Sequence, residues 1–176
     1  MILRGINVSG YKMIKMESLR AMFENLNFKN IKTYIQSGNV VFQFKETNID
    51  KIEKKIANKI QEEFGFEIPV MVKELDEIKT VLKNNSFVNK RKEDITKLHV
   101  TFLSQEPATD NIDKINKAQY LPDEFILRGN TIYLFCPNGY GNTKLSNNFF
   151  ENKLKVAATT RNWKTVNELA IMGENI

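Results

Sequence analysis

The stretch "IKTYIQSGNVVFQF" at residues 31–44 decides the fold of the first half of the chain. Bulky β-branched and aromatic residues occupy alternate positions on both sides of "SGN" at 37–39, which is the spacing of strands buried on one face. Small and polar residues of this kind are typical of the turn between two antiparallel strands. The stretch therefore predicts a β-hairpin.

Helical patterns flank this hairpin on both sides. Residues 17–27 carry hydrophobic residues at the i, i+3, i+4, i+7 spacing of one helical face, and a stripe of isoleucines from residue 49 ends before Gly65. The segments "MILRGIN" at 1–7 and "FEIPVMVKEL" at 66–75 add a strand at each end. The resulting order, β-α-β-β-α-β, is the split pattern of a ferredoxin-like fold.

The second half of the chain repeats this order of patterns. The predicted elements are a strand at 97–104, a short helix at 109–118, a hairpin at 124–136, a helix capped by Ser146, a strand at 155–160 and a closing helix at 162–170. We therefore expect the fold class α+β, with two tandem ferredoxin-like β-α-β-β-α-β units that have mainly antiparallel sheets.

A polar link is expected between the two patterns. A connecting helix capped by Asp76, and a polar run that ends at Asp94, separate the halves. The predicted domains are a first ferredoxin-like subdomain at 1–75, a connecting helix and linker at 76–96, and a second subdomain with the C-terminal helix at 97–176.

Composition excludes several classes of protein. The 176 residues carry a net charge of +5, and 41% of them are hydrophobic, which is typical of a globular protein. No hydrophobic run reaches the roughly 20 residues of a membrane-spanning helix, and the start lacks the order of a secretion signal, so we expect a cytoplasmic protein that does not bind a membrane. The single Cys136 and the single His99 leave too few ligands for an ordinary zinc site. The sequence leaves open whether the protein uses a cofactor.

Polar loops gather at one end of each predicted sheet. In the first half, the topology brings "RGINVSG" at 4–10 beside "QSGN" at 36–39. Glycines let backbone N–H groups approach a ligand closely, and an arginine beside them can bind a carboxylate or phosphate with two hydrogen bonds. The candidate ligand-binding residues of this cluster are Arg4, Gly5, Asn7, Gln36, Ser37, Gly38 and Asn39.

The second half offers a corresponding cluster where "PNGYGNTKLS" and "TTRNW" leave their strands. Its candidate ligand-binding residues are Gly139, Gly141, Lys144, Arg161 and Asn162. A small anionic ligand, phosphorylated or carboxylated, is therefore the expected partner. A structural interpretation stands beside this one, because turns are commonly built from Gly, Asn and Ser, and Asn162 can simply cap the last helix.

No catalytic residues are indicated, and the sequence leaves open whether the protein is an enzyme. Neither motif contains a carboxylate that could act as a general base, and alternation along the strands predicts that His99 and Cys136 face opposite sides of the sheet. Weak nucleic-acid binding by an RNA-binding module is one alternative, although the strand positions that would stack bases carry no aromatic residue. A structural or regulatory dimerisation module is the other, and the residues do not distinguish a monomer from a homodimer.

Four motifs resemble a known family. They are "LRGINVSG", "TYIQSGNVVF", "GNTKLSNNFFENKL" and "ATTRNWKTV", and in this order they are similar to the bacterial family called domain of unknown function 1697. The resemblance implies an α+β fold of ferredoxin-like units and no established activity. Ser9 departs from the pattern, because members of the family usually have glycine at this position.

Overall fold

A computed structural model of the chain describes residues 1–8 and 10–176, so that Ser9 lies outside the described residues. The chain divides into two compact units. Unit 1 comprises residues 1–78 together with 169–176, and unit 2 comprises residues 79–168. Two helices, α3 (Leu75–Lys83) and α7 (Trp163–Glu174), contain residues of both units.

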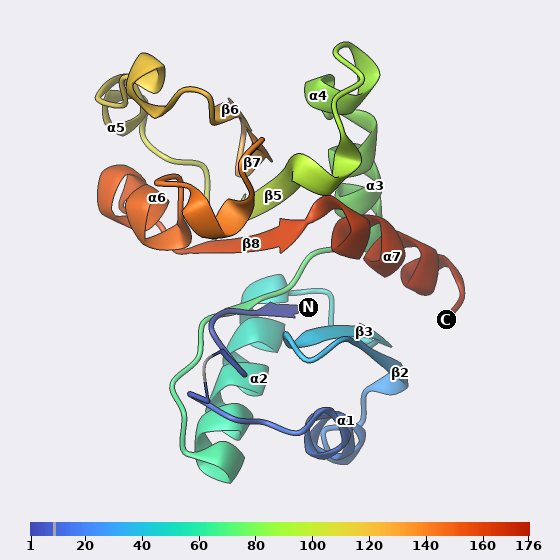
Figure 1. Ribbon diagram of the computed structural model, residues 1–176. Helices are drawn as coiled ribbons and strands as arrows, with labels where there is room; N and C mark the ends of the chain where they lie inside the picture. Colours follow the sequence, from blue (N-terminus) through green and yellow to red (C-terminus); the bar gives the residue numbers. More distant parts are fainter. Residues whose placement is uncertain (9) are drawn as a thin grey trace. The chain divides into compact units, whose positions relative to one another are not determined.

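The sheet of unit 1 has the strand order β2-β3-β1-β4, in which all neighbouring strands are antiparallel (Figure 1). This order is the ferredoxin-like arrangement that the split pattern predicted, and the prediction is confirmed. The elements are β1 (Ile2–Leu3), α1 (Met16–Asn25), β2 (Lys29–Tyr34), β3 (Asn39–Gln43), α2 (Ile49–Phe64) and β4 (Val70–Met71).

The core of unit 1 lies between this sheet and the helices α1 and α2. The isoleucine stripe of α2 is completely buried at Ile56 and Ile60, against strand residues such as Leu3. Helix α2 begins after Asn48, whose side chain accepts a hydrogen bond from the Lys51 N–H. The helix ends at Gly65 in the left-handed conformation, with φ of 74°.

The hairpin turn of unit 1 is longer than the sequence predicts. Strand β2 ends at Tyr34, and the chain turns through residues 35–38 before β3 begins. Ile35 has φ of 49° and Gly38 has φ of 71°, so both lie in the left-handed region. The predicted alternation was therefore wrong at Ile35, whose side chain is half exposed instead of packing on one face of the sheet.

The sheet of unit 2 repeats the same architecture with the order β6-β7-β5-β8. Its elements are α4 (Ser86–Asn89), β5 (Leu98–Leu103), α5 (Thr109–Asp113), β6 (Glu124–Arg128), β7 (Thr131–Phe135), α6 (Asn147–Leu154) and β8 (Ala158–Asn162), with short 3-10 turns η1 (Ile95–Lys97), η2 (Lys117–Tyr120) and η3 (Tyr140–Asn142). The repeated order confirms the predicted α+β class with two ferredoxin-like units.

Both faces of this second sheet are buried. On one face, Leu134 and other strand residues pack with Phe150 of α6. On the opposite face, the hydroxyl of Tyr133 donates a hydrogen bond of 3.0 Å to the Val81 carbonyl oxygen, and Phe87 packs near Phe135. Helices therefore cover both faces of this sheet within unit 2.

Two local predictions need correction. Helix α3 begins at Leu75, so Asp76 lies in its first turn and is not its cap, while the Glu77 carboxylate accepts a hydrogen bond from the Glu74 N–H. The polar run that was predicted as an exposed link contains the helix α4, whose Phe87 is completely buried. A single buried ring anchors this segment although its neighbours are polar and charged.

Candidate functional site

The predicted meeting of the two polar loops in unit 1 is confirmed by hydrogen bonds. The Leu3 N–H donates to the Gly38 carbonyl oxygen at 2.9 Å, and Asn7 Nδ2 donates to the Gln36 carbonyl oxygen at 2.8 Å. The loop that leaves β1 therefore lies beside the hairpin turn between β2 and β3. This placement follows from the split topology, in which β1 and β2 run in the same direction.

Asn7 uses its side chain to hold the loop that follows β1. Its Nδ2 also donates to the Ile14 carbonyl oxygen at 2.9 Å, and its Oδ1 accepts from the Ile14 N–H at 2.8 Å. The residue has φ of 54°, a conformation that asparagine tolerates better than most residues. Both amide hydrogens of Asn7 are therefore occupied within the protein.

The hairpin turn is held in a similar way. Asn39 is completely buried, and its Nδ2 donates to the Tyr34 carbonyl oxygen at 3.1 Å and to Ser37 Oγ at 2.9 Å. A Cβ atom added to Gly38 would lie 2.7 Å from the Leu3 Cβ, so only glycine fits there. These contacts support the structural interpretation of Asn7, Ser37, Gly38 and Asn39.

The remaining candidates of unit 1 are Arg4, Gly5 and Gln36. The Arg4 N–H donates to the Pro69 carbonyl oxygen at 3.1 Å, and the Arg4 side chain is partly buried. Gly5 has φ of 70° with open space where a Cβ would lie, and the side chain of Gln36 is exposed. The ligand-binding role of all seven residues stays a prediction.

In unit 2, the candidate residues lie in the loop after β7 and at the end of β8. The Gly139 N–H donates to the Cys136 carbonyl oxygen at 2.9 Å, which closes a turn before η3. Gly141 and Lys144 are exposed. Asn162 Oδ1 accepts from the Thr165 N–H at 2.7 Å, so Asn162 caps α7, as the structural interpretation proposed.

Arg161 is the charged group of this end of the sheet. Its side chain is partly buried, and its Nη1 donates to the Thr160 carbonyl oxygen at 2.8 Å. Burial lowers the pKa of the guanidinium to about 10, while the hydroxyl of Tyr140 favours the charged form. Arg161 therefore carries a positive charge at neutral pH in surroundings that have lost much of their water.

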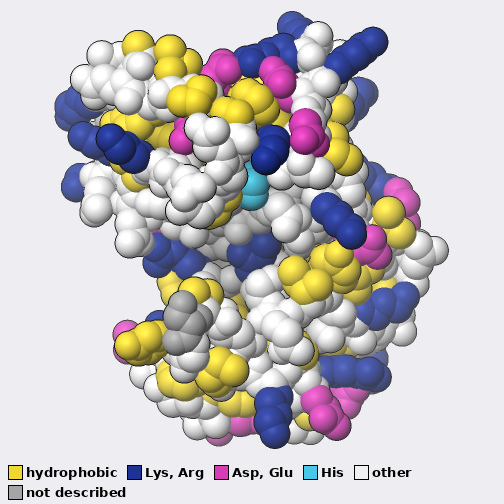
Figure 2. All heavy atoms as spheres, viewed as in Figure 1, with side chains coloured by type: hydrophobic (Ala, Val, Ile, Leu, Met, Phe, Trp, Pro, Cys, Tyr) yellow, Lys and Arg dark blue, Asp and Glu magenta, His cyan; other side chains and the backbone are white. Residues whose placement is uncertain are grey.

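Sequence reasoning missed two stacked aromatic groups at this end of the sheet. The ring of His99 stacks on the ring of Tyr140, with centroids 4.8 Å apart, and His99 lies directly opposite Asn162 across the β5–β8 pair. Burial lowers the pKa of His99, so its imidazole is neutral at pH 7, and the Lys97 backbone partly opposes this shift. The cyan histidine nevertheless reaches the surface in Figure 2.

A network of hydroxyl and amide groups lies on the face of the sheet that carries His99, whereas Arg161 pairs with Val100 and therefore belongs to the opposite face at the end of β8. Thr160 Oγ1 donates to Asn147 Oδ1 at 2.6 Å, and it lies 2.7 Å from Thr101 Oγ1. The network connects β5, β8 and α6. We call the group of His99, Thr101, Tyr140, Asn147, Thr160 and Arg161 the polar end of unit 2. Polar residues at alternate positions of 99–101 and 160–162 were the signal that could have found it.

The prediction that His99 and Cys136 face opposite sides of the sheet was wrong. His99 pairs with Leu134 across β5 and β7, and the face of Leu134 continues to Cys136. The prediction assumed that apolar residues mark only one buried face of the sheet. Because both faces of this sheet are buried, apolar neighbours do not show which face a residue such as His99 lies on. Burial also raises the pKa of the Cys136 thiol to about 11, so it is protonated at neutral pH and is a poor nucleophile.

Two kinds of feature are absent from residues 1–8 and 10–176. No group of three or more His, Cys, Asp and Glu side chains is placed to hold a metal ion. Within the same residues, no helix combines the length and the apolar character that crossing a membrane requires.

Together, the fold and the two loop ends define a class of α+β proteins built from two ferredoxin-like units. A solved structure with this fold is the conserved bacterial protein SP0830 from Streptococcus pneumoniae, which matches with a TM-score of 0.70. The match has 20% sequence identity and covers 97% of this chain and 95% of that chain. At this identity, the similarity shows a shared fold.

The family model described as "Protein of unknown function (DUF1697)" matches residues 1–133. This is more than half of the chain, and the chain therefore belongs to that family, as the resemblance of its motifs predicted. The motifs "GNTKLSNNFFENKL" and "ATTRNWKTV" lie beyond the matched residues. No curated protein matches the chain.

Proposed function

We propose that the polar end of unit 2 binds a small anionic ligand that carries a phosphate or carboxylate group. The observation that carries this proposal is the Arg161 guanidinium at the end of β8, which is partly buried and positively charged at neutral pH. A guanidinium can bind an anion with two parallel hydrogen bonds, and partial burial strengthens the electrostatic attraction between them. Arginine is suited to this role because its planar donors match both groups.

The other groups of the polar end support the shape of such a site. The Thr101–Thr160–Asn147 contacts fix β8 against β5 and α6, so the backbone that carries Arg161 is rigid. The exposed Lys144 follows η3 in the same loop and adds a second positive charge for attracting anions. The glycines at 139 and 141 keep the loop free of bulky side chains.

The loop end of unit 1 is the weaker candidate for the same function. Its two asparagines already use both of their amide hydrogens in bonds within the protein. The proposal therefore rests on unit 2, and a ligand contact of Arg4, Gly5 and Gln36 stays a prediction, as does the cytoplasmic location. No catalytic step is proposed.

Nucleic-acid binding has less support. The residues at the strand positions that would stack bases include Leu3 and Asn39, and both are completely buried. In addition, Figure 2 shows acidic side chains among the basic ones on the visible face. RNA binding and a structural module without a ligand are therefore treated as outcomes of the test.

The test is the melting temperature of the protein against sulfate, phosphorylated metabolites, carboxylates and short RNAs, each at low and high salt. A ligand at about 100 times its Kd stabilises the fold by about 2.7 kcal/mol, which is a shift of roughly 5 to 10 °C for a chain of this size. We expect one class of small anion to produce a shift that survives high salt.

The matched variants are Arg161→Gln and Arg128→Gln, because both arginines belong to unit 2 and only Arg161 lies at the polar end. The shift should disappear in Arg161→Gln and persist in Arg128→Gln. A shift by RNA alone that fades with salt would replace the proposal with nucleic-acid binding. A panel without any shift would favour a structural module.

A further inference from the structure

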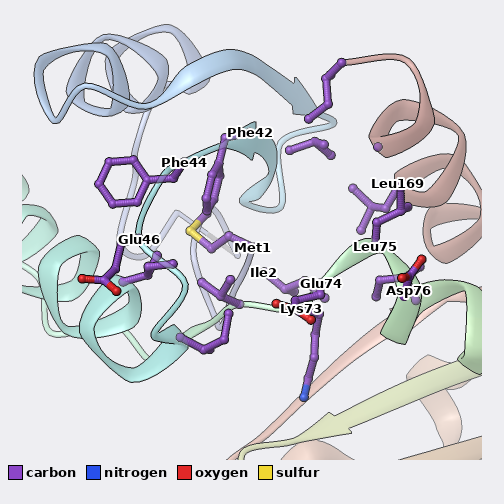
Figure 3. A pocket seen from close by; sticks show the side chains of 17 residues that line it. Met1, Ile2, Phe42, Phe44, Glu46, Lys73, Glu74, Leu75, Asp76 and Leu169 are labelled. Carbon is purple, nitrogen blue, oxygen red and sulfur yellow. The ribbon is translucent and has the colours of Figure 1, made fainter.

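A separate pocket lies entirely within unit 1. Its volume is about 500 Å³, which falls in the range of small-molecule sites. Figure 3 shows Phe42 of β3 and Phe44, just beyond the end of β3, on one side of it, with Leu75 and Leu169 on the other. The starts of α2 and α3 and the end of α7 also contribute to its wall.

The walls of this pocket leave apolar surface uncovered. Phe42, Phe44 and Ile49 are each only partly buried, whereas Ile56 further along α2 is completely buried. Aromatic rings that remain partly exposed in a concave wall are typical of ligand sites. The pocket can therefore shield the apolar part of a ligand from water.

Charged groups at the rim are mainly acidic. Glu46, Glu74 and Asp76 line the pocket, and Lys73 is the basic side chain among its described lining residues. Lys73 Nζ lies 3.3 Å from Glu77 Oε1, so its positive charge is paired. The rim thus has an excess of negative charge.

Two helix N-termini also border the pocket, and helix N-termini ordinarily favour anions. Here, side chains already accept hydrogen bonds from backbone N–H groups at these ends. Glu46 Oε1 accepts from the N–H groups of Thr47 and Asn48, at 3.1 and 3.0 Å, and Glu77 Oε2 accepts from that of Glu74 at 2.9 Å. These three N–H groups are therefore engaged, and the acidic side chains of the rim give the pocket its negative charge.

We propose that this pocket binds a small amphipathic cation, an organic amine with an apolar or aromatic tail. Its ammonium group would lie at the rim beside Glu74, and its tail would pack on Phe42 and Phe44. Charge complementarity favours a cation over an anion at this rim. This site differs from the polar end of unit 2 in location and in the charge of its ligand.

The test compares three probes with the same tail, phenylbutylamine, phenylbutanol and phenylbutyrate, by NMR titration of the full chain at low salt. The amine should bind most tightly and the acid most weakly, and the amine should perturb the signals of Leu75 and Leu169. Equal binding of the amine and the acid, or perturbation elsewhere only, would overturn the proposal.

Matched variants test which residues of the pocket contact the ammonium group and the apolar tail of the probes. Glu74→Gln should lower the affinity for the amine by about threefold to fivefold, which is the effect of losing an exposed ion pair, and should leave the affinity for the alcohol unchanged. Glu63→Gln, near the opposite end of α2, is the control and should change neither probe. Val41→Phe narrows the pocket and should lower the affinity for all three probes.

If Val41→Phe fails to fold, Glu74→Gln decides the question alone. An unchanged amine affinity in Glu74→Gln would overturn the proposal. This result is independent of anion binding, which the Arg161 variant tests.

Discussion

Units 1 and 2 share one strand order, yet they use their polar loop ends differently. In unit 1, Asn7 and Asn39 bond to the backbone of neighbouring segments and hold the loops together. In unit 2, Arg161 and His99 lie at the loop end, and burial lowers the pKa of both side chains. Similar residue types at corresponding ends therefore do not imply similar roles, and the hydrogen bonds that each side chain already makes separate the two cases.

The lengths of the strands explain part of this difference. In unit 1, β1 and β4 have two residues each, so few ladder hydrogen bonds fix the end of the sheet. In unit 2, β5 pairs over five positions with β7 and over five with β8. We infer that side chains in unit 1 supply bonds that longer strands supply in unit 2.

The largest effect is expected at the turn of unit 1. Gly38→Ala should lower the free energy of unfolding by about 3 kcal/mol, because φ of 71° disfavours alanine and its Cβ would overlap Leu3. Gly65→Ala is the control, since Gly65 has φ of 74° with open space around it and should cost only about 1 kcal/mol. Urea denaturation measures both, and equal losses would mean that the turn is not closely packed.

The two asparagines at the loop ends give the next comparison. Asn7→Ala should lower the free energy of unfolding by about 2 to 3 kcal/mol. The substitution removes three side-chain hydrogen bonds and leaves backbone groups of Ile14 and Gln36 without these partners. Asn162→Ala removes one helix cap and should cost about 1 kcal/mol. The reverse order in chemical denaturation would contradict the structural role of the unit 1 loop.

The smallest effect concerns pH and unit 2. Burial holds the pKa of His99 in the folded protein below the ordinary 6.5 of the unfolded chain. Between these two pKa values the unfolded chain binds more protons than the folded protein does. The free energy of unfolding therefore falls as the pH drops below 6.5. The slope from one group is at most about 1.4 kcal/mol per pH unit. His99→Gln should flatten this part of the stability curve, and an identical curve would show that His99 is not buried as described.

Much of the fold could be predicted from the sequence, because the periodicity changes clearly between strands and helices. The split order also predicted correctly that residues 4–10 meet the turn near Gly38, and the Asn162 cap followed from its position before a helix. These features depend on local patterns and on a topology with few alternatives. The domain bounds 1–75, 76–96 and 97–176 stay a prediction.

Other features depend on tertiary contacts that no local pattern reveals. The burial of Phe87 in a polar run, and the shared face of His99 and Cys136, follow from a sheet that is covered on both sides. The left-handed conformation of Ile35 is disfavoured by its own side chain and arises from the turn around it. The polar end of unit 2 likewise needs the registers of β5 and β8, which place His99 opposite Asn162.

The most direct test of anion binding at the polar end is an NMR pH titration of His99, the only histidine of the chain. We expect a pKa below 6.5 for the protein alone. Saturating sulfate, which does not titrate in this range, should raise the pKa, because an anion beside Arg161 and Tyr140 favours the imidazolium form. The increase should be absent in Arg161→Gln. An ordinary pKa near 6.5 that no small anion changes would contradict the account.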